Sequence, residues 1–71
     1  MSASIQDPAL SLGARLRAAR DRLALSQKEL AAILGCSERS LQDYEAGAAF
    51  PRPALRRTIV AFLAEHEEAA A

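Results

Sequence analysis

Four polar side chains fall on one face of a short predicted helix: Glu38, Arg39, Gln42 and Asp43. They lie opposite Leu41 and Tyr44, which we expect to face the interior. Arg39 can donate two hydrogen bonds to O6 and N7 of guanine, and Gln42 matches the N6 and N7 pattern of adenine. Glu38 can only accept, for example from the amino group of cytosine. Such a face can read base edges if a helix carries it into a major groove.

The two acids on this face limit that chemistry. A carboxylate in a phosphate-lined groove is repelled unless it meets an amino donor or an arginine. Asp43 stands four residues after Arg39, a spacing that favours an ion pair within the helix. If the helix enters such a groove, we therefore expect one subunit to bind DNA selectively, with modest affinity and with a dependence on salt.

Catalytic chemistry is not indicated. The single histidine, His66, and the single cysteine, Cys36, lie far apart in the sequence. The sequence has no glycine-rich phosphate loop, no cluster of metal ligands and no plausible triad, so we expect no enzyme activity, cofactor or metal. A lone cysteine excludes an intramolecular disulfide. We expect Cys36 to be a small buried hydrophobe and His66 to be solvated.

Two short helices joined by a tight turn are predicted to position the polar face. Ser26 and Glu29 form a Ser-x-x-Glu capping box at the start of the first helix, and Gly35 ends it. Its apolar residues at helical spacing are Leu30, Ile33 and Leu34. Ser37 caps the second helix and Gly47 ends it. Two such helices make a helix-turn-helix unit.

This stretch resembles the Cro and lambda-repressor-like helix-turn-helix family, also called the xenobiotic-response-element family. The shared residues are Leu25-Ser26-Gln27, Glu29-Leu30-Ala31, Leu34-Gly35, Ser37, Leu41, Tyr44-Glu45 and Gly47, with Leu12-Gly13 and Leu16-Arg17 upstream. The resemblance covers about residues 11–63. It implies an all-α, compact lambda-repressor-like domain of four to five helices, and sequence-specific binding of double-stranded DNA by a transcriptional regulator.

The resemblance also implies residue roles. The base-reading positions would be Glu38, Arg39, Gln42 and Asp43. The phosphate-contacting positions would be Gln27, Lys28, Ser37 and Arg52. Arg20 and Glu45 would form a partly buried ion pair between the first helix and the end of the reading helix. Many relatives carry several basic residues in the loop at 46–52, whereas this chain has only Arg52 there.

Composition bounds the remaining possibilities. The chain has 71 residues, 51% of them hydrophobic but only 4% aromatic, which suits one small helical domain. The formal net charge is zero, yet all nine basic residues and five of the nine acids lie between residues 9 and 64, so that part is modestly basic. No signal peptide or membrane span is predicted, and we expect a cytoplasmic protein.

The predicted boundaries follow from caps and apolar stripes. Residues 1–6 are expected to be disordered, 7–64 to form the domain, and 65–71 to be an acidic, frayed tail. Asp7 and Pro8 would start the first helix, which would end near Leu23-Ala24. Its apolar stripe is Leu12, Leu16, Ala19 and Leu23. Pro53 would start the last helix, whose buried stripe is Leu55, Ile59, Phe62 and Leu63. Phe50 is expected to pack against the core.

Assembly and a second functional class stay open. One module of this size covers half an operator, so we expect a homodimer, at least on DNA, that binds a palindromic operator. Its surface would come from the loop before the last helix or from that helix, with Val60 and Ala64 as candidates. The alternative function is an antitoxin or a protein-docking helix-turn-helix module with a protein partner. Whether the chain is an excised domain also stays open.

Overall fold

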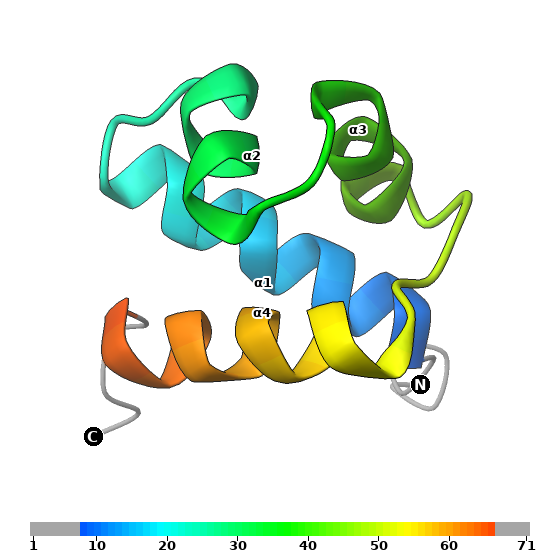
Figure 1. Ribbon diagram of the computed structural model, residues 1–71. Helices are drawn as coiled ribbons and strands as arrows, with labels where there is room; N and C mark the ends of the chain where they lie inside the picture. Colours follow the sequence, from blue (N-terminus) through cyan, green and yellow to red (C-terminus); the bar gives the residue numbers. More distant parts are fainter. Residues whose placement is uncertain (1–7, 67–71) are drawn as a thin grey trace, which may run out of the picture.

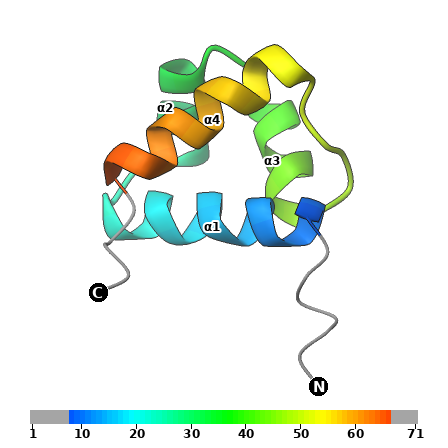
Figure 2. The same cartoon turned by 90° about the horizontal axis from the view of Figure 1, so that it is seen from below.

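The computed structural model describes residues 8–66, and within this range it contains four α-helices and no strand. The helices are α1 (Pro8–Arg22), α2 (Gln27–Leu34), α3 (Glu38–Ala46) and α4 (Pro53–His66). In Figure 1, α2 and α3 lie side by side above α1, and α4 runs along the bottom. Seen from below, α4 crosses α1 obliquely (Figure 2). The predicted all-α class with a helix-turn-helix is confirmed.

The ends of α2 and α3 are held by short-range hydrogen bonds. The hydroxyl of Ser26 accepts from the Glu29 backbone N–H at 3.0 Å, and the Glu29 carboxylate accepts from the Ser26 N–H at 2.8 Å. Gly35 (φ 82°) and Gly47 (φ 76°) end the two helices in the left-handed conformation. The predicted capping box and glycine stops are therefore present.

The helix α1 ends close to the predicted Leu23-Ala24, but through a turn that the sequence did not indicate. The helix stops at Arg22, and Ala24 adopts a left-handed backbone (φ 58°) that is unusual for a residue with a Cβ. The Leu25 N–H bonds to the Arg20 carbonyl at 3.0 Å and the Ala24 N–H to the Asp21 carbonyl at 3.1 Å, which is the Schellman pattern. Leu23 follows the last helical turn and is 37% exposed, so its predicted place in the apolar stripe was wrong.

All four helices contribute to one core. The side chains with the least exposure are Leu16 of α1, Leu30 of α2, Leu41 of α3, and Ile59 and Leu63 of α4. Five further buried residues complete the core: Leu12, Ala19, Ala31, Leu34 and Phe62. Burying a side chain of this size contributes about 1.5–3 kcal/mol. Packing of this core fixes the direction of α3 relative to the rest of the domain.

Two other burial predictions need correction, and one apolar residue of α2 lies outside the core. That residue, Ile33, is 56% exposed, because α2 buries the adjacent strip formed by Leu30, Ala31 and Leu34. Phe50 is 43% exposed, and its neighbour Pro51 is buried instead. Cys36 is only half-buried against the core.

The last helix extends to His66, two residues beyond the predicted end of the domain. His66 is exposed, as predicted, but its ring also packs on Phe62 with centroids 4.7 Å apart. Arg22 donates a hydrogen bond to the carbonyl of His66 and so joins the ends of α1 and α4. Val60 is 49% exposed, in line with its predicted surface position.

The predictions for residues 1–6, for Asp7 as a helix cap and for the end of the acidic tail fall outside the described residues. None of the helices between residues 8 and 66 is long and apolar enough to cross a membrane.

Candidate nucleic-acid interface

The first turn of α3 is organised by Ser37. Its hydroxyl accepts a hydrogen bond from the Ser40 backbone N–H at 3.0 Å and donates one to the Ser40 hydroxyl at 2.9 Å. The cap satisfies one of the N–H groups that a helix start leaves without an internal partner. Ser37, expected to contact a phosphate, therefore serves first as a helix cap.

The four predicted base-reading side chains lie together on the outer side of α3. Leu41 is fully buried beneath the helix, whereas Glu38, Arg39 and Gln42 are exposed and Asp43 is half-exposed. The three exposed side chains, Glu38, Arg39 and Gln42, follow the Ser37 cap closely and thus point outward from the first turns of α3. Those turns are the part of a recognition helix that reaches base edges.

Arg39 and Asp43 form the expected ion pair within α3. Arg39 Nε lies 3.4 Å from Asp43 Oδ1, and the side chains are 81% and 38% exposed. An exposed pair of this kind contributes about 0.3–0.5 kcal/mol. Such a small contribution leaves the guanidinium free to exchange the carboxylate for the two acceptors of a guanine, whose contact is worth more.

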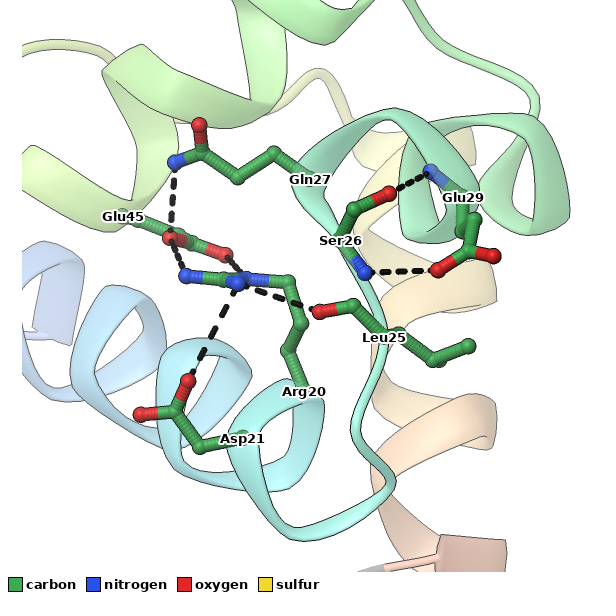
Figure 3. A network of polar contacts seen from close by, with 7 residues as sticks. All are labelled: Arg20, Asp21, Leu25, Ser26, Gln27, Glu29 and Glu45. Atoms are coloured by element: carbon green, nitrogen blue, oxygen red, sulfur yellow. Dashed lines mark hydrogen bonds and ion pairs between the residues drawn. The ribbon is translucent and has the colours of Figure 1, made fainter.

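A polar network fixes the other end of α3 (Figure 3). Arg20 Nε lies 2.8 Å from Glu45 Oε2 and Arg20 Nη2 lies 3.0 Å from Glu45 Oε1, so the structure brings the predicted pair into two-point contact. The two side chains are 14% and 5% exposed. The hydrogen bonds that Arg20 donates to the Glu45 carboxylate raise the pKa of the Arg20 guanidinium, which keeps it charged. Arg20 also donates to the Leu25 carbonyl at 3.1 Å, where α1 turns toward α2.

Gln27 belongs to the same network, which the sequence did not reveal. Its side-chain amide nitrogen donates to Glu45 Oε1 at 3.1 Å, and the residue is half-buried. Gln27 therefore joins the first turn of α2 to the end of α3, in addition to its predicted place at the phosphate-facing end of α2. Lys28 and Arg52, the other predicted phosphate contacts, are exposed.

Gly13, expected only as a residue shared with the family, also positions α3. A Cβ atom added at Gly13 would lie 2.2 Å from the Tyr44 carbonyl oxygen, so α1 touches the backbone at the end of α3. The available signal was a glycine inside a predicted helix, which often marks close backbone approach.

Between residues 8 and 66 no group of three or more histidine, cysteine or acidic side chains could hold a metal.

A family model described as "Helix-turn-helix domain" matches residues 11–71. A search of curated proteins and a search of solved structures each gave no match. The matched region includes the capped pair α2–α3 and the exposed polar face of α3. The chain belongs to the helix-turn-helix domain family of DNA-binding domains, in agreement with its resemblance to the Cro and lambda-repressor-like proteins.

Proposed function

We propose that the protein is a sequence-specific transcriptional regulator, acting as a repressor in the cytoplasm, that inserts α3 into the major groove of double-stranded DNA. One observation carries the proposal: α3 presents four polar side chains on one exposed face and is held at both ends. Ser37 caps its start and the Arg20–Glu45 pair fixes its end. A rigid, solvent-facing helix can place side chains on base edges without first being ordered.

The proposed readout divides between bases and phosphates. Arg39 releases Asp43 and binds guanine, Gln42 binds adenine, and Glu38 accepts from cytosine. The groups proposed to set the register on the phosphate backbone are Gln27, Lys28, Ser37 and Arg52. No cofactor or metal is required for this mechanism.

Two copies are proposed to bind one palindromic operator, with half-sites about 34 Å apart. The outer face of α4 offers an apolar surface for a homodimer: Val60 is 49% exposed and lines a shallow hollow with Ala61 and Ala64. Sedimentation of the protein with and without operator DNA tests this assembly. A monomeric mass at high micromolar concentration in both samples would exclude the dimer.

The decisive experiment is selection from a randomised duplex library, followed by affinity measurements at several salt concentrations. Arg39→Ala is expected to weaken binding to the selected site by about 1–3 kcal/mol and to relax the preference at one base pair. Lys28→Ala is the matched contrast, because losing a phosphate contact weakens binding uniformly across sequences and lowers the salt slope by about one.

A protein-docking or antitoxin module is the second candidate. It is favoured by the Arg39–Asp43 pair, which neutralises a cation on the outer face of α3, and by a loop whose one cation is Arg52. Under this alternative no sequence is enriched, and residual DNA binding disappears at physiological salt. An antitoxin can also repress, so binding to a toxin alone does not argue against the first proposal.

A further inference from the structure

The loop between α3 and α4, residues 47–52, holds an exposed aromatic ring beside α3. Phe50 is 43% exposed, and the Arg56 guanidinium carbon lies 5.1 Å from the centre of its ring. Two backbone N–H groups fasten the start of this loop to α3, since those of Ala48 and Ala49 lie 2.8 and 3.3 Å from the Asp43 carbonyl oxygen. The ring is thus held at the surface between a fixed loop and a cation.

Phe50 borders the outer face of α3. A hollow of about 390 Å³ lies between α3 and the loop, and Ser40, Asp43, Phe50 and Arg52 are among the residues that line it. Figure 2 shows the loop passing beside α3 on its way from the end of that helix to the start of α4. A duplex that receives the outer face of α3 therefore also comes close to Phe50.

We propose that Phe50 is a specificity-determining residue that packs on the 5-methyl group of a thymine at the edge of the half-site. The inference rests on the proposed DNA binding and adds a base preference to it. The thymine methyl is the apolar group that a base pair presents in the major groove, and aromatic side chains contact it. Arg52 is exposed and lines the same hollow as Phe50, and the Arg56 guanidinium lies over the ring. Two cations near the ring would therefore be available to phosphates next to the contacted base.

An apolar contact has a different signature from a phosphate contact. A contact between Phe50 and a base displaces no counterions from the DNA when the protein binds. Phe50→Ala should therefore lower the affinity for DNA without changing the slope of affinity against salt concentration. Burial of one methyl group corresponds to about a fourfold change in affinity. Contact with deoxyribose would also be apolar, but it would not depend on the methyl group of the base.

The test is a double-mutant cycle on the DNA site selected by the wild-type protein. Each thymine is replaced in turn by deoxyuridine, which lacks only the methyl group. At one position in each half-site, this replacement should lower the affinity of the wild-type protein for DNA about fourfold. The same replacement should leave the affinity of Phe50→Ala unchanged. Phe50→Leu, which keeps an apolar side chain, should retain most of the thymine preference.

Leu23→Ala is the matched control, because Leu23 is 37% exposed in the turn between α1 and α2, at the other end of the molecule in both views. It should leave the thymine preference unchanged. Circular dichroism checks that each variant is folded.

The outcomes separate the two proposals. If the wild-type protein selects no site, the proposed function fails. If it selects a site but the Phe50→Ala and deoxyuridine effects are additive at every thymine, DNA binding stands and the role of Phe50 is overturned. Equal weakening on thymine and uracil DNA would assign the ring to the sugar and would likewise overturn the proposed base preference.

Discussion

Replacing Gly13 by alanine tests whether α1 and α3 are in backbone contact. An added Cβ would lie 2.2 Å from the Tyr44 carbonyl oxygen, 3.1 Å from that of Glu45 and 3.2 Å from the Glu45 Cα. These atoms belong to the backbone of α3, so no side-chain rotation can relieve the closest contact. The two helices must separate by about 1 Å to restore a normal contact distance.

Two opposing effects decide how far Gly13→Ala changes the free energy of unfolding. Glycine to alanine inside a helix stabilises by about 1 kcal/mol. Overpacking costs about 1–3 kcal/mol and sometimes more, and the upper end applies here because backbone atoms collide. Moving α1 also strains the Arg20–Glu45 contacts at 2.8 and 3.0 Å, which join the same two helices. We expect a net loss of about 2 kcal/mol, or roughly 10 °C in Tm for a domain of this size.

Urea denaturation followed by circular dichroism at 222 nm measures this change. Ala18→Gly is the control, since Ala18 is exposed on the same helix and reports helix propensity alone, about 1 kcal/mol of destabilisation. If Gly13→Ala is as stable as the wild type or more stable, α1 does not approach α3 at this position and the reasoning is refuted.

Two further predictions concern Glu45 and Cys36. Glu45→Ala leaves the Arg20 side chain, which is 14% exposed, without its carboxylate partner. It should lower the free energy of unfolding, measured by urea denaturation, by about 3 kcal/mol. Arg39→Ala removes the exposed Arg39–Asp43 pair and should change the free energy of unfolding by less than about 0.5 kcal/mol. Burial raises the pKa of the Cys36 thiol above its ordinary value, so the unfolded chain loses this proton first as pH rises. The contribution of the protonated Cys36 thiol to folding stability is complete below the thiol's pKa in the unfolded chain. It is lost as the pH rises through the higher pKa of the thiol in the folded protein. Cys36→Ala should lack this alkaline loss, and equal pH profiles for the two proteins would contradict the assignment.

The helix ends were predictable because they depend on residues close together in the chain. Ser26 bonds three residues ahead, Ser37 bonds to Ser40, and Gly35 and Gly47 occupy left-handed positions that glycine favours. The left-handed turn that follows α1 was not predicted, because Ala24 takes the conformation that a glycine would normally mark.

Burial was predicted less well at the edges of the apolar stripes. Leu16, Leu30, Leu41, Ile59 and Leu63 are all buried as expected. Ile33 and Phe50 are exposed, because their burial depends on which neighbouring element covers that side. Helical periodicity identifies an apolar face but does not define how wide a strip the other helices cover.

For the candidate interface, the sequence alone determined which side chains share the outer face of α3, because the caps and the 3.6-residue period settle that locally. The Arg20–Glu45 pair was expected only through the family resemblance, and the tertiary structure alone showed that Gln27 and Gly13 also hold the helix in place. Arg20, Gln27 and Glu45 come from three different helices, and Gly13 touches α3 across the core. Such contacts depend on the relative placement of whole helices, which arises from packing the shared core and cannot be read from any one segment.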